Sequence, residues 1–366
     1  MNLYKKHIVL TVLCTLVTLL ALFVIYISSP ISSELQPSTF QRNFAKEIVG
    51  LLKIESLGRP SNYIAGFDEK RIWFGNYDRP SKLKSMDLSL QDQQEVEIKL
   101  EKVDSIVEPG RFRTIVNRDR FFLTNGIMPI ILTGDKKNWT AREIKFSKYF
   151  YFNSAFPIND TTFVLQAYNT EKKGLQLGLL VLADSPKFKF NDNLLTPQQE
   201  GIFSVQGQTD YNNETNTLTY LYTYRNQYLV IDNDLNLKGT GNTIDTFRTA
   251  PITVREVDND GTSMLSSPPF ATNPCSTLSG DFLYVRSNLL AKNENKGKFL
   301  ISSTIDVYNI NTKEYVLSFH IPNLTNKSIT EFKIIDDKIY ALFDDTVGLF
   351  ELKALKDLQS KSISKK

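Results

Sequence analysis

The chain has 366 residues, of which 23% are charged and 41% hydrophobic, and its 43 Lys and Arg almost balance its 40 Asp and Glu. It contains two histidines and two cysteines, too few for a multi-histidine metal site, a zinc cluster or a disulfide framework. A nearly neutral chain also lacks the basic surface that nucleic-acid binding requires, so no nucleic-acid partner is expected, and no cofactor is predicted.

The first element is an apolar segment that is long enough to cross a membrane. Residues 8–27 contain no charged side chain, and these 20 residues, at about 1.5 Å each, span the roughly 30 Å hydrocarbon layer. Lys5 and Lys6 precede the segment and no further Lys or Arg occurs before Arg42, so the positive-inside rule keeps the N-terminus in the cytoplasm. We predict a cytoplasmic stub at 1–7, a transmembrane anchor at 8–27, and an extracytoplasmic remainder that faces the periplasm or the cell surface.

A cleavable signal peptide is the alternative for this segment, because several small serines follow the apolar core: Ser28, Ser29, Ser32 and Ser33. A signal peptide usually has an apolar core of about 7–15 residues that ends in an Ala-x-Ala-like cleavage site. The longer core and the missing site favour an uncleaved, single-pass anchor.

The rest of the chain repeats a pair of short apolar strands separated by turns rich in Asn, Asp, Gly and Pro. The first strand of each pair starts at Ile72, Phe121, Phe163, Leu218, Phe282 and Ile339, at intervals of 42 to 64 residues. Its partner follows at 83–88, 128–132, 175–182, 228–231, 305–310 and 347–352. A period near fifty is typical of propeller blades, which must stack on their neighbours to bury both faces. The sequence therefore predicts an all-β, six-bladed β-propeller over residues 45–353, whereas a two-sheet sandwich gives no reason for the period.

The two ends of the repeat region complement each other. The sixth pair ends near Leu352 without an outer strand, and residues 354–366 resemble a flexible polar tail. Residues 47–54 are apolar and have no partner of their own, so we predict that they close the ring as the missing strand and hide its edge. A short juxtamembrane helix starting near Phe40 is the alternative, and residues 28–44 are taken as a linker.

A sequence motif of an acidic turn followed by an apolar strand recurs along the chain, and it is similar to a motif of known propellers. Residues 336–342, Asp-Asp-Lys-Ile-Tyr-Ala-Leu, and 280–285, Gly-Asp-Phe-Leu-Tyr-Val, are similar to the TolB-like six-bladed propellers, in particular the exported or anchored bacterial ones. The likeness covers about residues 45–353 and includes no catalytic motif. It implies the fold, and it is compatible with a membrane-tethered ligand-binding, protein-binding or scaffold module.

Catalytic residues are sparse in the repeat region. His320 lies in an outer strand without a Gly-x-Ser-x-Gly motif, and Cys275 has no exported partner, so we read both as structural. Residues 258–261, Asp-Asn-Asp-Gly, lack one ligand position and the distal Glu of a calcium loop, which indicates a solvated turn. A hydrolase or lactonase-like enzyme with a metal in the channel is the alternative function.

One face of a propeller gathers the connections between blades and the turns between the second and third strands of each blade. Arg, Asn and Tyr recur at these places, and Arg binds planar anions through two hydrogen bonds. The candidate ligand- or partner-binding residues are Arg59, Arg111, Arg113, Tyr224, Arg225, Arg248, Arg286 and Asn288. We predict a positive rim around the channel mouth that binds an anionic small molecule or a protein partner.

The connection into the fifth blade lies on the same predicted face. Residues 240–274 far exceed the roughly 2–6 residues of an ordinary connection, and loops of this length are often functional. The segment contains Phe270 after two prolines, which suggests an exposed aromatic on a stiff arm. We predict a lid or a partner-docking arm.

Overall fold

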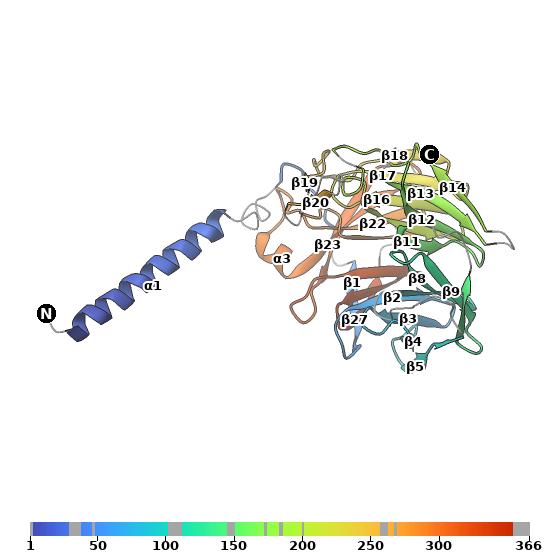
Figure 1. The fold of residues 1–366 in the computed structure, drawn as a ribbon, viewed down its shortest axis with the longest axis horizontal. Helices are drawn as coiled ribbons and strands as arrows, with labels where there is room; N and C mark the ends of the chain where they lie inside the picture. Colours follow the sequence, from blue (N-terminus) through green and yellow to red (C-terminus); the bar gives the residue numbers. More distant parts are fainter. Residues whose placement is uncertain are drawn as a thin grey trace.

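The structure is a computed structural model, and it describes residues 3–28, 38–45, 48–101, 112–144, 151–171, 174–182, 186–199, 201–256, 263–266 and 269–353. Figure 1 shows α1 (Leu3–Ser28) as one long helix that projects away from a rounded assembly of strands. Its stretch Tyr4–Ile25 is apolar and long enough to cross a membrane, a property that signal sequences share. The predicted tail at 354–366 and the possible calcium loop at 258–261 lie outside the described residues.

The strands form a six-bladed β-propeller, in which four antiparallel strands make up each blade and, except for β1 in blade 6, follow chain order. Blade 1 consists of β2 (Asn62–Phe67), β3 (Arg71–Asn76), β4 (Lys82–Asp87) and β5 (Gln94–Glu97). Blade 2 consists of β7 (Arg113–Asn117), β8 (Arg120–Asn125), β9 (Ile130–Asp135) and β10 (Thr140–Ile144), with β6 (Lys99–Leu100) parallel to β10. Blade 3 consists of β11 (Phe152–Pro157), β12 (Thr162–Asn169), β13 (Gly174–Val181) and β14 (Lys187–Asn191).

The remaining three blades complete the ring. Blade 4 consists of β15 (Gly207–Asn212), β16 (Thr217–Tyr222), β17 (Tyr228–Asp232) and β18 (Leu237–Gly241). Blade 5 consists of β21 (Cys275–Ser279), β22 (Phe282–Ser287), β23 (Ser302–Asn309) and β24 (Tyr315–Pro322), with α3 (Lys296–Leu300) between β22 and β23. Blade 6 consists of β25 (Glu331–Ile335), β26 (Lys338–Phe343), β27 (Thr346–Leu352) and β1 (Val49–Ser56). All six predicted strand pairs are therefore confirmed as the second and third strands of a blade.

The ring closes through the two ends of the repeat region. β1 pairs antiparallel with β27, from Val49 opposite Leu352 to Ser56 opposite Thr346. This confirms that an N-terminal strand completes the last blade. The alternative helix starting near Phe40 is wrong, because Phe44 instead forms a parallel bridge with Ser318 of β24. Part of the predicted linker thus lies along blade 5 before the chain enters blade 6.

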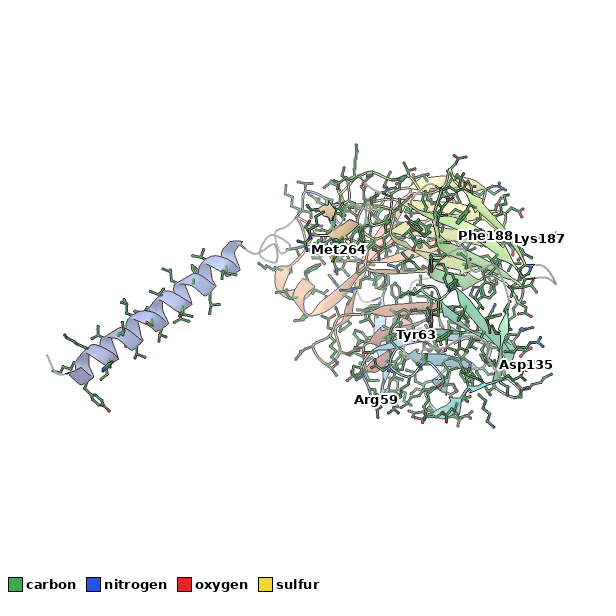
Figure 2. The ribbon with its side chains drawn as sticks, viewed as in Figure 1. Arg59, Tyr63, Asp135, Lys187, Phe188 and Met264 are labelled. Carbon is green, nitrogen blue, oxygen red and sulfur yellow. The ribbon has the colours of Figure 1, made fainter. Side chains whose placement is uncertain are left out.

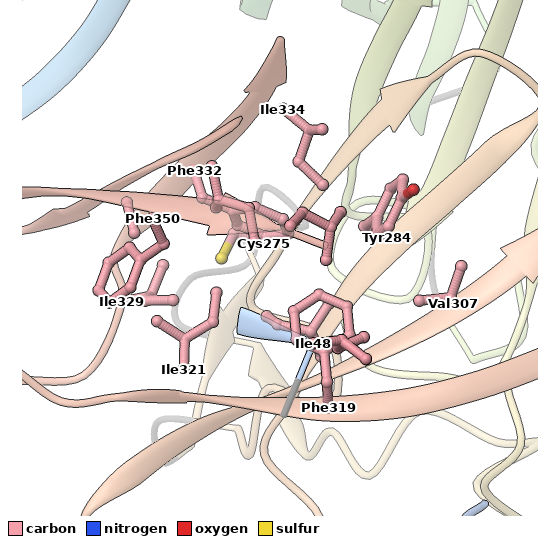
Figure 3. Packing of buried hydrophobic residues seen from close by; sticks show 14 of the residues in the cluster. Ile48, Cys275, Tyr284, Val307, Phe319, Ile321, Ile329, Phe332, Ile334 and Phe350 are labelled. Atoms are coloured by element: carbon pink, nitrogen blue, oxygen red, sulfur yellow. The ribbon is translucent and has the colours of Figure 1, made fainter. Parts of the chain in front are cut away.

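Among the described residues, six apolar clusters form the core of the propeller, one between each pair of neighbouring blades. Consecutive side chains of one strand serve two clusters: Trp73 packs with blade 2 and Phe74 packs with blade 6. Figure 3 shows the cluster between blades 5 and 6, where Cys275 lies among aliphatic and aromatic side chains. Since both faces of a blade are buried in this way, the sequences of its second and third strands are nearly continuous runs of apolar residues.

Asparagines at strand ends stabilise the turns that follow them. Oδ1 of Asn76 accepts the amide of Asp78 at 3.1 Å, and Oδ1 of Asn125 accepts the amides of Ile127 and Met128, also at 3.1 Å. These are Asx turns, in which the side chain satisfies backbone donors beside a tight reversal. The recurring asparagines are thus explained by turn formation.

The long connection into blade 5 carries a small hairpin, β19 (Val254–Glu256) and β20 (Ser263–Leu265). Phe270 is half-buried and packs against a cluster of Phe40, Leu289 and Ala291, so the expectation of an exposed aromatic is wrong. The physical reason is that the N-terminal arm, residues 38–45, covers this side of blade 5, which sequence spacing could not reveal. Residues 257–262, 267 and 268 lie outside the described residues.

Candidate channel-mouth site

The first strand of each blade lines a central channel with a volume of about 1900 Å³. Side chains of a strand alternate between two faces, and the burial of β7 and β25 follows this alternation, with every second residue less buried. In β7 the channel-facing residues are half-buried Arg113, Ile115 and Asn117, and in β25 they are Glu331, Lys333 and Ile335. The channel wall is therefore a place where charged side chains from distant parts of the sequence meet.

Four residues form what we name the mouth cluster: Tyr63, Tyr77, Arg113 and Glu331. Nη1 of Arg113 donates to the hydroxyl of Tyr77 at 2.5 Å, and Nη2 donates to Oε1 of Glu331 at 3.1 Å. The guanidinium carbon lies 4.5 Å from the centre of the Tyr63 ring. Tyr77 follows β3, whereas Arg113 and Glu331 begin β7 and β25, so the cluster lies at the end of the channel where the inter-blade connections arrive.

The backbone and its neighbours hold this cluster in place. The other carboxylate oxygen of Glu331, Oε2, accepts the amide of Ile64 at 2.9 Å, and the amide of Thr114 donates to the Tyr63 hydroxyl at 2.7 Å. Burial lowers the pKa of Arg113, but Glu331, Tyr77 and Tyr63 together outweigh burial and raise it above its ordinary value. Arg113 therefore stays charged, with 39% of its side chain exposed and 23% of that of Glu331.

A second ion pair lies further along the channel. Nζ of Lys333 is 2.7 Å from Oδ1 of Asp210, and the Ser276 hydroxyl donates to Oδ2 at 2.6 Å. Burial lowers the pKa of Lys333, but attraction by Asp210 and Glu331 raises it overall. Asp210 is 6% exposed, so this pair is shielded from solvent more than the mouth cluster is.

Both ion pairs pass over an intervening blade. Arg113 of blade 2 reaches Glu331 of blade 6 past the first strand of blade 1, which contributes the amide of Ile64. Lys333 of blade 6 reaches Asp210 of blade 4 past blade 5, which contributes Ser276. The two pairs thus tie five first strands together around the channel.

The structure gives the predicted site residues different surroundings. Arg113 is the one that lies in the channel lining, whereas Arg59 and Arg248 are exposed at the surface, and Arg111 lies outside the described residues. Figure 2 shows Arg59 at the periphery of the propeller and Tyr63 further in. The structure therefore does not bring these residues together as one described cluster.

The other four predicted residues support loops. Arg225 is buried, donates to the carbonyl of Thr196 at 3.0 Å and lies 3.6 Å from the Tyr222 ring centre, and burial lowers its pKa. Arg286 donates to the carbonyl of Ile329 at 2.7 Å and to Oδ1 of Asn288 at 2.9 Å. Asn288 also donates to the carbonyl of Ala271, and the Tyr224 hydroxyl lies 3.4 Å from Oε1 of Gln206.

Sequence reasoning missed Glu331, Lys333 and Asp210. It relied on the strongly apolar second and third strands and did not follow the alternation of polar and apolar residues at the start of β25. Glu331-Phe332-Lys333 shows that alternation, with Phe332 fully buried between two half-buried charged residues. In blade 6, this alternating segment just before the apolar pair is the signal that could have identified the channel wall.

The alternative function requires a set of metal ligands in the channel, and the part of the chain that the structure describes contains no such set. Among those residues, no three His, Cys, Asp or Glu side chains converge on one point. Cys275 is buried, and burial raises the pKa of its thiol to about 12. Nδ1 of His320 lies 3.2 Å from the hydroxyl of Ser302 and 3.3 Å from that of Thr304.

The fold defines the class of this protein as a six-bladed β-propeller with a central channel whose wall carries two ion pairs. The chain is similar to the crystal structure of a member of the DUF4221 family from Bacteroides vulgatus, with a TM-score of 0.52 and 11% identity over 86% of this chain and 98% of that one. It is also similar to virginiamycin B lyase from Staphylococcus aureus, with a TM-score of 0.48 and 11% identity over 83% of this chain and 99% of that one. No family model and no curated protein sequence matches the chain. At these identities the likeness shows the fold alone.

Proposed function

We propose that the chain is a membrane-tethered, extracytoplasmic propeller that binds a small ligand at the mouth cluster. The ligand carries a carboxylate for Arg113, a neighbouring hydrogen-bond donor such as an ammonium or hydroxyl for Glu331, and an apolar part that contacts Tyr77. The expected anionic ligand is therefore a small carboxylic acid that carries an ammonium or hydroxyl group and an apolar side group. A scaffold role for the rest of the surface is compatible with it.

The observation that carries the proposal is a partly exposed ion pair, Arg113–Glu331, at the mouth of a large channel. Two of the five guanidinium N–H donors of Arg113 are used by Tyr77 and Glu331 within the described residues, so donors remain for a carboxylate. Tyr77 is 46% exposed beside them and offers a ring face. Sites on such a rigid scaffold lose little conformational entropy on binding.

The membrane tether is proposed from α1 and its flanks. The helix has the length of a membrane span, and Lys5 and Lys6 at its start favour a cytoplasmic N-terminus. Under that orientation the propeller is periplasmic or at the cell surface, as in the exported TolB-like propellers that the repeat text resembles. Resistance of the full chain to alkaline extraction from membranes tests the anchor, and recovery of a soluble chain beginning near Ser33 would contradict it.

The proposed ligand class is tested by isothermal titration calorimetry, which measures the binding of three probes to the full chain in detergent: phenylalanine, 3-phenylpropionate and inorganic phosphate. Phenylalanine is expected to bind most tightly, because it alone offers a carboxylate, an ammonium and a ring. The variant Arg113→Met should lose this binding, whereas Arg59→Met, an exposed arginine outside the channel lining, should retain it. Equal binding by both variants, or no binding of any probe, would count against the mouth cluster as the site.

A further inference from the structure

The N-terminal arm, residues 38–45, fixes one loop of blade 5 close to the point where the chain leaves α1. The amide of Ser38 donates to the carbonyl of Leu290 at 2.7 Å, and the amide of Lys292 donates to the carbonyl of Phe40 at 2.9 Å. Ser28 ends α1, and ten residues of extended chain reach at most about 36 Å. The loop is therefore held within that distance of the end of the helix, and Figure 1 shows α3 on the side of the propeller that faces α1.

The same loop presents an apolar and basic surface, which we name the blade-5 tip and define as residues 292–301. Leu300 is 52% exposed and Ile301 is 69% exposed, although they are adjacent and aliphatic. Three lysines of the tip are exposed: Lys292, Lys296 and Lys298. All residues of the tip are described, and its single acidic residue, Glu294, is buried against Arg42 at 2.6 Å. The accessible charge of the tip is thus entirely positive.

Hydrogen bonds fix the backbone of the tip, so the exposure of its apolar residues is a property of the fold. Asn295 caps α3 by accepting the amide of Lys298 at 3.0 Å, and the amide of Asn323 donates to the carbonyl of Ile301 at 2.9 Å. The hydroxyl of Ser302 donates to the carbonyl of Lys298 at 2.6 Å. These contacts hold Leu300 and Ile301 outward at the end of a short, capped helix.

We propose that the blade-5 tip inserts into the surface of the membrane that α1 spans and that it prefers anionic phospholipid. Aliphatic side chains flanked by lysines are the composition of surfaces that lie at the lipid headgroups, where lysines meet anionic lipid while apolar side chains enter the acyl boundary. The N-terminal arm keeps the tip close to the membrane, and the aliphatic and lysine side chains of the tip provide the contacts with lipid. This inference rests on the proposed membrane anchor, and it orients the propeller with blade 5 toward the bilayer.

The test uses the full chain with Cys14→Ser, reconstituted in phosphatidylcholine vesicles with or without phosphatidylglycerol. An environment-sensitive fluorophore is attached at Ile301→Cys, and the buried Cys275 is inaccessible to the label in the folded chain. The matched control is Ile127→Cys, which is 63% exposed in a loop of blade 2, opposite blade 5 in the ring. Alkaline extraction of the same samples reports separately whether α1 is inserted.

The expected result is a blue-shifted emission and protection from an aqueous quencher at position 301 but not at position 127, stronger with phosphatidylglycerol. Each Lys→Gln change at 292, 296 or 298 should reduce the inserted fraction relative to the free fraction by about fivefold. Chain that is inserted but has a fully quenched label at 301 overturns this inference and leaves the proposed anchor standing. Protection that increases with the number of chains per vesicle at constant lipid composition would also overturn it, because a second copy of the chain would then cover the tip. Chain that is extracted by alkali contradicts the anchor itself.

Discussion

Arg42 donates to both carboxylate oxygens of Asp306, from Nε at 2.7 Å and from Nη2 at 3.0 Å, although 264 residues separate the two in the chain. Nη1 also donates to Glu294 at 2.6 Å and to the carbonyl of Leu289 at 2.8 Å. All three charged side chains are almost inaccessible to solvent. One buried guanidinium therefore locks the N-terminal arm into blade 5 and satisfies two carboxylates that would otherwise be buried without a cation.

The variant Arg42→Met should destabilise the propeller by about 3–5 kcal/mol, because removing one partner of a buried ion pair leaves the other charges uncompensated. Chemical denaturation of the full chain in detergent measures the loss. The exposed Arg59→Met serves as the control and should change the free energy of unfolding by less than about 0.5 kcal/mol. Similar midpoints for the two variants would contradict the proposed lock.

Gly75 should not tolerate a side chain, because a Cβ there would lie 2.3 Å from the ring of Tyr63. Gly75→Ala is expected to cost about 1–3 kcal/mol and to weaken ligand binding at the mouth cluster, since Tyr63 lies under Arg113. Gly50→Ala is the matched strand control, with its nearest contact at 3.6 Å to the flexible end of Lys353. Thermal melts of both variants measure the difference, and an unchanged Gly75→Ala melt would show that Tyr63 moves freely.

The Lys333–Asp210 pair can be examined by a double-mutant cycle. Lys333→Met should destabilise the chain by about 1–3 kcal/mol, because Asp210 is then buried without its cation. Adding Asp210→Asn should recover part of that loss, since no uncompensated charge remains. Additive losses in denaturant unfolding would mean that the two side chains do not interact.

His320 should make stability depend on pH. Burial, together with Lys298 and Arg42, lowers the pKa of His320 to about 4 from an ordinary value of 6.5. Between these values the unfolded state binds more protons than the folded state, so the free energy of unfolding falls as the pH decreases from 6.5 to about 4. The full loss reaches roughly 3 kcal/mol. Denaturation of His320→Gln across this window should show a shallower slope than the parent chain, and parallel slopes would refute the assignment.

Ring closure by β1 predicts unequal effects of two deletions. Removing residues 44–54 exposes the edge of β27 and takes away the outer strand of blade 6, so the melting temperature should fall sharply. Removing residues 358–366 from the polar tail should leave it nearly unchanged. Equal melting temperatures would mean that β1 contributes nothing to closure.

The number and position of the blades could be predicted from the sequence, because each blade buries both faces and its second and third strands must therefore be apolar at every step. Phe121 and Phe122 show this directly, since neighbouring residues enter the clusters toward blades 1 and 3. The apolar N-terminal helix and the closing strand were also predicted from runs of neighbouring apolar residues. In each case the signal is a property of adjacent residues, and it survives without knowledge of the rest of the chain.

The candidate site was decided by the tertiary structure. Arg113 and Glu331 are 218 residues apart, and neither has a neighbour in sequence that reveals the other. Arginines on the predicted face looked equivalent in the sequence, yet Arg113 faces the channel, Arg225 and Arg286 hold backbone carbonyls, and Arg59 is exposed. Hydrogen bonds and ion pairs depend on which atoms come within about 3 Å, and only the closed ring of blades sets those distances.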